Sequence, residues 1–185
     1  VGADLIAHSI RDLPVDREFI AAVPEQGVCY IPTLTREVST FVCEDVPEFF
    51  AEPYFLKEAD PQVMAQLQTP ERMSRMANSR AAQAYKAGLE VALANVGALH
   101  AADIPIAMGT DTGPPARFQG YFEHMELQLM ADAGMSPLDV IRSATGVAAD
   151  CIGVSDIGTL EPGRWADFSI LTANPAVDTA NTKTI

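Results

Sequence analysis

The stretch Ile104-Pro-Ile-Ala-Met-Gly-Thr-Asp-Thr-Gly113 decides the fold class of this 185-residue chain. Residues 104–108 are continuously apolar, which is typical of a strand buried in a parallel sheet whose two faces are covered by helices. Gly109 ends this strand and Asp111 follows it. In α/β sheets and barrels, reactive groups gather where parallel strands end. The stretch therefore predicts an α/β fold with a candidate functional carboxylate at a strand end.

Two further strands are predicted upstream of this stretch. Leu5-Ile-Ala7 is a short apolar run that stops at His8, and Val28-Cys-Tyr-Ile31 is a β-branched, apolar run that stops at a proline. Between them, residues 16–26 have apolar side chains at helical spacing, followed by a glycine. Strands that alternate with helices in this way predict right-handed crossovers and a parallel sheet.

The connection over residues 33–69 is predicted to be irregular, with short helical pieces near 46–52 and 60–68. A connection of this length inside a compact domain is usually a lid or a binding loop. Thr69-Pro70 is predicted to begin the longest helix, because an N-cap followed by proline is a typical helix start. The apolar stripe of that helix continues at helical spacing to residue 99.

Two more helices and a small β element are predicted in the last third of the chain. One helix is expected at about 120–133, and Ser136-Pro137 indicates the start of another. After Gly153, residues 157–160 and 167–171 are predicted to form short strands about a tight turn.

The composition excludes several classes of partner. The chain has 12 Lys and Arg against 25 Asp and Glu, and its formal net charge is −13. Nucleic acids and anionic membrane surfaces both select positive patches, so no nucleic-acid partner and no membrane partner are expected. No apolar run reaches the length that a membrane span needs.

The cysteine pattern points to a reducing environment. Cys29, Cys43 and Cys151 are odd in number and widely spaced, which does not suggest a disulfide framework, and no C-x-x-C pair suggests zinc. A cytoplasmic location is the default for such a pattern. The chain is expected to begin inside a folded domain, and a segment before Val1 could carry a secretory signal.

Asp111 and the histidines are the candidates for chemistry. At a strand end, Asp111 could bind a metal or take a proton from an attacking water, or it could only satisfy loop backbone in an Asx turn. His8 would lie at the same edge as a metal ligand, with a structural histidine as the alternative. His124 could contact substrate or be a surface residue, and His100 is expected to neutralise carbonyls at a helix end.

Four stretches taken together resemble the C-terminal half of amidohydrolase-superfamily enzymes, in the branch of imidazolonepropionases and Xaa-Pro dipeptidases. They are Ile104–Gly113, Glu123-His-Met-Glu-Leu127, Gly134–Thr145 and Gly158–Leu171. Their ordered succession over nearly the whole chain is more specific than any one of them.

The resemblance implies that the chain is the C-terminal part of a TIM-like (β/α)8 metal-dependent hydrolase barrel. Residues 1–153 would supply strands 6–8 with their helices, and residues 154–185 a piece of a small composite β-sandwich. The family's H-x-H pair, its bridging lysine and the histidine of the fifth strand are absent from the sequence. The chain is therefore expected to need an N-terminal half supplied by another chain or by a longer protein. A homo-oligomer remains one possible assembly of the protein.

The resemblance also implies an activity and a site. One or two divalent metals, with zinc expected, would be held by His8 and Asp111, and Asp111 would also act as general base. The activity would be hydrolysis of carbon–nitrogen bonds in a non-peptide amide, cyclic amide or dipeptide through a metal-activated water. The alternative is a catalytically incomplete fragment or assembly partner. The candidates for substrate binding are His124, Arg36, Tyr54, Arg117 and Tyr121.

Overall fold

Three parallel segments form the sheet of the computed structural model, which describes residues 2–114 and 116–185. Strand β1 (Leu5–Ala7) pairs in parallel with β2 (Cys29–Ile31). Tyr30 of β2 also forms a parallel bridge to Ile106, because its N–H donates to the Pro105 carbonyl and its carbonyl accepts from Ala107. The predicted strands at 5–7 and 28–31 thus pair in parallel, whereas the strand predicted at 104–108 is reduced to this single bridge. These described residues do not close a barrel.

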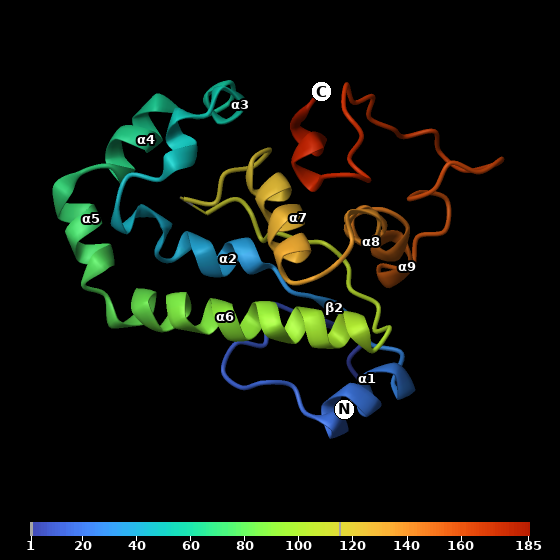
Figure 1. Ribbon diagram of the computed structural model, residues 1–185. Helices are drawn as coiled ribbons and strands as arrows, with labels where there is room; N and C mark the ends of the chain where they lie inside the picture. Colours follow the sequence, from blue (N-terminus) through green and yellow to red (C-terminus); the bar gives the residue numbers. More distant parts are fainter. Residues whose placement is uncertain (1, 115) are drawn as a thin grey trace.

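Helices surround these segments, and none in the described part of the chain is long and apolar enough to cross a membrane. In Figure 1 the long helix α6 runs beneath α2, and α7 lies on the other side of α2, in agreement with the packing of α2 against both. The helices are α1 (Arg17–Glu25), α2 (Leu34–Ser39), η1 (Val42–Glu44), η2 (Glu48–Ala51), α3 (Pro53–Leu56), α4 (Pro61–Leu67), α5 (Pro70–Ala77), α6 (Arg80–Ala101), α7 (Phe122–Asp132), α8 (Pro137–Ser143), α9 (Gly146–Cys151) and η3 (Thr179–Lys183).

Two groups of buried side chains hold the fold together. The first joins Tyr30 of β2 and Ile106 to Val96 of α6 and Met130 of α7, so it lies between the sheet and its helices. The second is aromatic and joins Phe49 and Phe55 to the residues that precede and begin α7. Burial of such side chains stabilises a fold by roughly 1.5–3 kcal/mol for each one. The aromatic group includes Ala116, Phe118 and Tyr121, which come from the segment that follows Asp111.

The single long helix predicted from Thr69 is wrong, because the chain forms two helices there, α5 and α6. Asn78 ends α5, and its side-chain amide donates to the Ser74 carbonyl at 2.7 Å. Ser79 then caps α6 by accepting from the Ala82 N–H at 3.3 Å. These side chains compete with helical hydrogen bonds and so favour a break at this point.

Helix α2 lies in the connection that was predicted to be irregular. Thr33, which precedes it, makes no side-chain cap. Instead Glu126 of α7 accepts from the N–H groups of Leu34 and Thr35 at 2.8 and 2.7 Å. Because this cap comes from a residue far along the chain, no local pattern could indicate it.

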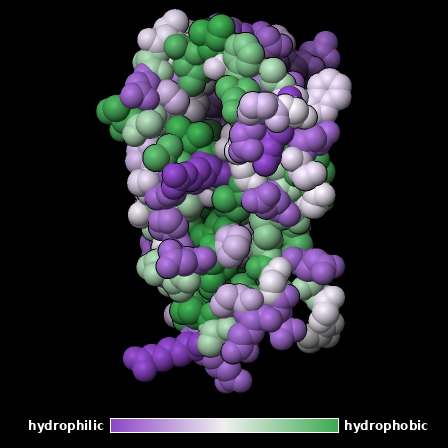
Figure 2. Space-filling view, turned by 90° about the vertical axis from the view of Figure 1, so that its right-hand side faces the viewer, coloured by the Kyte–Doolittle hydropathy of each residue, from purple (hydrophilic) through white to green (hydrophobic). Residues whose placement is uncertain are grey.

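The strands predicted at 157–160 and 167–171 are wrong for this structure, which describes no strand in residues 154–185. Side chains there have no sheet to cover them, so Trp165, Phe168 and Ile170 are 66%, 66% and 77% exposed. Figure 2 turns this side of the molecule to the viewer and shows hydrophobic residues at the surface over much of it. The β-sandwich assignment of residues 154–185 stays a prediction.

The expectation that the cysteines form no disulfide is also wrong. Cys29 of β2 and Cys151 of α9 are joined by a disulfide although 122 positions separate them in sequence, and Cys43 is free and buried. The fold brings the two cysteines together, which their spacing could not indicate. The cysteine pattern therefore no longer supports the prediction of a reducing compartment.

Candidate functional site

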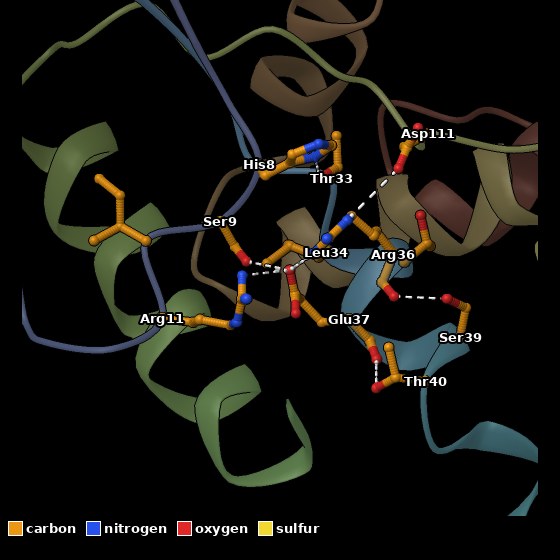
Figure 3. A network of polar contacts seen from close by, with 12 residues as sticks. His8, Ser9, Arg11, Thr33, Leu34, Arg36, Glu37, Ser39, Thr40 and Asp111 are labelled. Atoms are coloured by element: carbon orange, nitrogen blue, oxygen red, sulfur yellow. Dashed lines mark hydrogen bonds and ion pairs between the residues drawn. The ribbon is translucent and has the colours of Figure 1, made fainter. Parts of the chain in front are cut away.

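Residues that follow the three parallel segments meet at one edge of the sheet. His8 follows β1, Thr33 lies two residues after β2, and Asp111 comes after the bridge at Ile106. All three have backbone φ angles in the left-handed region, at 77°, 48° and 54°. Figure 3 shows His8 beside Thr33, with Asp111 nearby across from Arg36. The structure thus places an imidazole, a hydroxyl and a carboxylate at neighbouring strand ends, where α/β proteins carry their sites.

Thr33 holds the ring of His8. Its Oγ1 lies 2.9 Å from Nδ1 of His8. Thr33 is buried, and its contact with His8 is partly buried. A hydrogen bond at one ring nitrogen fixes the orientation of an imidazole and decides which nitrogen can bind another group. Among residues 2–114 and 116–185, Nε2 of His8 has no hydrogen-bond partner.

Two arginines hold the carboxylate of Asp111. Nη1 of Arg117 donates to Oδ2 of Asp111 and, at 2.9 Å, to its backbone carbonyl. Nε of Arg36 lies 3.6 Å from the same Oδ2. Asp111 is 41% exposed, so solvent weakens these ion pairs, and their main effect is to orient the carboxylate. Both arginines were predicted to bind substrate, and in the structure both bind the candidate base.

A buried carboxylate anchors Arg36 in turn. Oε1 of Glu37 accepts from Arg36 at 3.1 Å, from Arg11 at 3.2 Å and from the hydroxyl of Ser9 at 2.7 Å. Glu37 is completely buried, and its Oε2 has no partner among the described residues. Arg36 therefore bridges a buried carboxylate and the exposed carboxylate of Asp111 (Figure 3).

Glu126 positions the helix that carries these groups. Its Oε1 accepts from the N–H of Leu34, and its Oε2 accepts from the N–H and, at 2.8 Å, the hydroxyl of Thr35. Burial raises the pKa of Glu126 to about 7, while these hydrogen bonds oppose the increase. Because α2 begins directly after Thr33 and contains Arg36, Glu126 fixes the partners of both His8 and Asp111.

His124 lies in α7 with both ring nitrogens occupied. Nε2 lies 2.7 Å from the hydroxyl of Tyr54, and Nδ1 lies 2.8 Å from Oγ1 of Thr182. Burial and the nearby Lys183 lower the pKa of His124. Tyr121 donates its hydroxyl to Glu52 at 2.9 Å. The contacts of His124 tie α3 to η3, and its predicted contact with substrate stays a prediction.

Three of the predicted substrate-binding residues surround one cavity of about 590 Å³. Tyr54 and Tyr121 contribute to its wall together with Arg117, which also contacts Asp111. Arg36 does not line it. The five candidates therefore fall into two groups. Arg36 and Arg117 contact Asp111, whereas Tyr54, Tyr121 and His124 lie together around α3 and α7. Arg117 links the groups, because it also lines the cavity.

The donor set at the strand ends fits part of a zinc site. His8 offers an imidazole nitrogen and Asp111 a carboxylate oxygen, which are ligands that zinc accepts. The contact of Nδ1 of His8 with the Thr33 hydroxyl orients the ring and leaves Nε2 for another group, as a hydrogen bond at one ring nitrogen does in metal-binding histidines. Within residues 2–114 and 116–185, no three His, Cys, Asp or Glu side chains gather closely enough to hold a metal. His8 and Asp111 are thus two donors of kinds that zinc accepts, which is fewer than the three or four protein ligands of a zinc site.

Thr33, Glu37 and Glu126 are parts of this arrangement that the sequence analysis missed. Thr33 follows an apolar strand as His8 and Asp111 do, so the same rule could have found it. Glu37 and Glu126 are acidic residues within helices, and nothing local to them indicates that the fold buries them.

Comparison with known proteins confirms the family. The model of the amidohydrolase family matches residues 18–185, and the chain belongs to this family. An imidazolonepropionase of Streptomyces coelicolor is 32% identical over 68 residues, which are 37% of this chain and 17% of that protein. One from Streptomyces avermitilis is 34% identical over 68 residues, with 37% and 16% covered. The chain therefore matches a small part of the length of these relatives.

Solved structures show the same fold. A Xaa-Pro dipeptidase with bound methionine superposes with a TM-score of 0.67 at 21% identity, over 99% of this chain and 37% of that one. A putative prolidase from Bifidobacterium longum gives 0.67 at 25% identity, over 98% and 39%. Ochratoxinase of A. niger gives 0.63 at 24%, over 98% and 33%. This chain thus corresponds to about a third of each structure.

Proposed function

We propose that the chain forms part of a metal-dependent hydrolase that cleaves carbon–nitrogen bonds of small amides, cyclic amides or dipeptides. The family supports hydrolysis of such bonds. The observation that carries the proposal for this chain is the arrangement of Asp111. Two guanidinium groups orient its carboxylate at the same sheet edge as His8. In this proposal, residues 1–153 supply strands 6–8 of a (β/α)8 barrel and residues 154–185 join a β-sandwich.

A bound divalent metal would be held by Nε2 of His8 and by Asp111, and it supplies a water of lowered pKa and polarisation of the scissile carbonyl. Oδ2 of Asp111 accepts one hydrogen bond, from Arg117, and keeps a lone pair with which it would hold the metal, so Oδ1 is the oxygen available to accept a proton. Oδ1 accepts a proton from the water as the water oxygen bonds to the carbonyl carbon. Oδ1 then returns that proton to the leaving nitrogen as the carbon–nitrogen bond breaks.

The arginines keep Asp111 ready for this proton transfer. Arg117 donates to both the carboxylate and the backbone carbonyl of Asp111, which limits rotation of the side chain. Arg36 is restrained in turn because its Nη1 donates to Oε1 of the buried Glu37. A base held in one orientation reaches the reactive geometry without an entropic cost at the moment of reaction.

The test replaces Asp111 in the complete protein. Asp111→Asn preserves size and accommodates the left-handed backbone, so we expect an unchanged thermal unfolding temperature and loss of turnover by about 10²-fold or more on a panel of amides, cyclic amides and dipeptides. Asp103→Asn is the matched control, because Asp103 also has a positive φ of 58° but precedes the third parallel segment. Near-normal turnover by the Asp111 variant would remove Asp111 from this role.

A second candidate function is that of an inactive chain or assembly partner. The observation that favours it is that the described residues provide no group of three metal-binding side chains. Metal quantification on the complete protein separates the two functions. A stoichiometric divalent metal together with amide turnover supports the hydrolase, whereas absence of both supports the assembly partner.

A further inference from the structure

Glu123, in the first turn of α7, holds both ends of the loop that joins Asp111 to this helix. Its Oε1 is within hydrogen-bond distance of the hydroxyl groups of Thr110, at 3.2 Å, and Thr112, at 3.0 Å. Its Oε2 accepts from the N–H of Gly120 at 2.7 Å. One carboxylate thus binds the residues on either side of Asp111 and a residue just before α7.

The local sequence favours this arrangement. A carboxylate in the first turn of a helix interacts favourably with the helix dipole. Gly120 has a φ of 82°, a conformation that glycine adopts without strain, and the turn there directs its N–H toward Glu123. Thr110 is buried, so its hydroxyl needs a partner within the protein. Glu123 therefore satisfies polar groups at both ends of the loop.

The same loop carries a second group that contacts the candidate base. Arg117 lies in sequence between the two points that Glu123 holds, and its Nη1 donates to the carboxylate and the backbone carbonyl of Asp111. The direction of the guanidinium group depends on the path of the loop. A change at Glu123 would therefore reach Asp111 by two routes, through the residues beside it and through Arg117.

Asp111 needs such support because of its own backbone. Its φ of 54° lies in the left-handed region, which a residue other than glycine keeps only where its surroundings hold it. Hydrogen bonds at the residues on both sides of Asp111 restrain it there. Within the described part of the chain, Glu123 makes no hydrogen bond with Asp111 itself, so any effect passes through the loop.

We propose that Glu123 is a positioning residue for Asp111, which it holds in place through Thr110, Thr112 and the loop that bears Arg117. This inference rests on the proposed hydrolase function, in which Asp111 accepts a proton from the attacking water. Glu123 acts through its hydrogen bonds to the loop and takes no part in the proton transfer.

Two substitutions separate the hydrogen bonds of Glu123 from its charge. Glu123→Gln removes the charge but keeps an oxygen for the N–H of Gly120, and its NH₂ group can donate to the threonine hydroxyl groups, which accept as well as donate. Glu123→Met keeps helix propensity and removes all of these hydrogen bonds. Asp16→Ala is the matched control, because Asp16 also accepts from a backbone N–H, that of Phe19, but at the start of α1.

Hydrogen exchange of the Gly120 amide reports on the loop independently of turnover. In the complete protein, followed by NMR spectroscopy, we expect this amide to exchange about tenfold faster in Glu123→Met than in the wild type, because it has lost its acceptor. Glu123→Gln and Asp16→Ala should retain the wild-type rate. Equal exchange in the methionine variant and the wild type would mean that the loop does not depend on Glu123, and would overturn the proposal.

Steady-state kinetics on an amide that the wild type hydrolyses test the consequence for Asp111. In Glu123→Met we expect kcat to fall about 10–100-fold with KM within about twofold, because a displaced base affects the transition state more than substrate binding. Glu123→Gln and Asp16→Ala should keep kcat within about threefold of the wild type. Faster exchange at Gly120 with an unchanged kcat would leave Glu123 a purely structural role. An equal loss in the glutamine variant would assign the effect to charge, and either result refutes the proposal.

A double substitution tests the route through the loop. Thr112→Val should lower kcat by about threefold and add little to the loss in Glu123→Met, because the two groups act through one contact. Effects that add in full would contradict this route. A wild-type protein that hydrolyses no amide refutes the hydrolase, and the role of Glu123 with it, whereas wild-type turnover that survives Glu123→Met refutes the role of Glu123 alone.

Discussion

Substitution of Glu126 by glutamine should change how the stability of the protein depends on pH. The carboxylate accepts from the backbone N–H groups of Leu34 and Thr35 and from the hydroxyl of Thr35. Glutamine keeps one acceptor oxygen and replaces the other by an NH₂ group. Whichever way the amide turns, at least one buried backbone N–H then faces a donor, which costs about 1–3 kcal/mol.

The pH dependence follows from the direction of the pKa shift. Burial raises the pKa of Glu126 from its ordinary 4.5 to about 7 in the folded protein. Between these values the folded state binds more protons than the unfolded state, so the contribution of Glu126 to stability is present below pH 4.5 and is lost as the pH rises to 7. A shift of this size corresponds to a loss of about 3 kcal/mol.

Glutamine does not titrate, so the stability of the variant does not fall between pH 4.5 and 7 through ionisation at this position. We expect Glu126→Gln to be less stable than the wild type by about 2 kcal/mol at pH 5, and the difference to diminish or reverse by pH 8. Urea unfolding of both complete proteins at pH 5, 6, 7 and 8 measures the difference. Other acidic groups are common to both proteins and cancel.

Glu90→Gln is the matched control, because Glu90 is an exposed carboxylate on α6. Its stability difference from the wild type should remain within about 0.5 kcal/mol over this pH range. A Glu126 difference that stays constant with pH would show that this carboxyl does not titrate between pH 5 and 8. A difference that widens as the pH rises would show that its hydrogen bonds outweigh its burial, and either result would refute the reasoning.

Thr33→Val should weaken zinc binding by the complete protein about 10–100-fold in a chelator competition, because His8 loses the hydroxyl that orients it, whereas Thr33→Ser should bind normally. Equal affinity in the valine and serine variants would contradict this role. Loss of the disulfide in Cys151→Ala should lower stability by about 2–4 kcal/mol, because the link to Cys29 closes a long loop, and dithiothreitol should remove the difference from the wild type. Cys43 should resist alkylation by iodoacetamide at pH 8 until urea unfolds the protein, since burial raises the pKa of its thiol to about 11; rapid labelling of the folded protein would show that this thiol is accessible.

Elements whose signals are local were predictable from the sequence. The helix expected at 16–26 is α1, where Oδ1 of Asp16 accepts from the N–H of Phe19 at 2.8 Å and Gly27 follows with a φ of 64°. The short strands β1 and β2 were equally visible as apolar runs with clear ends. In these cases the hydrophobic spacing and the residues at the ends agree with the tertiary structure.

Features that depend on distant partners were not predictable. Helix α2 begins where Glu126 caps it, 92 positions from Leu34. The disulfide joins residues 122 positions apart. The break between α5 and α6 does have a local signal, because Asn78-Ser79 is typical of a helix end followed by a cap.

The residues of the candidate site also divide into those with a local sequence signal and those whose contacts depend on the tertiary structure. His8 and Asp111 could be found because polar residues at the ends of parallel strands point to one edge of a sheet. The sequence could not show that Arg36 and Arg117 hold Asp111, because those contacts depend on the path of α2 and of the loop after Asp111. The arginines were therefore predicted to bind substrate.

The backbone at the strand ends gives a separate reason to regard this edge as functional. A non-glycine residue in a sparsely populated backbone region costs about 1–3 kcal/mol, and His8, Thr33 and Asp111 all have positive φ angles. Thr33 is the least favourable of the three, because its side chain is β-branched. It is held there by burial, by its contact with His8 and by Glu126, which binds the next two N–H groups. Asp103 also has a positive φ away from this edge, so what distinguishes His8, Thr33 and Asp111 is that all three lie at neighbouring strand ends and that each side chain has a partner there.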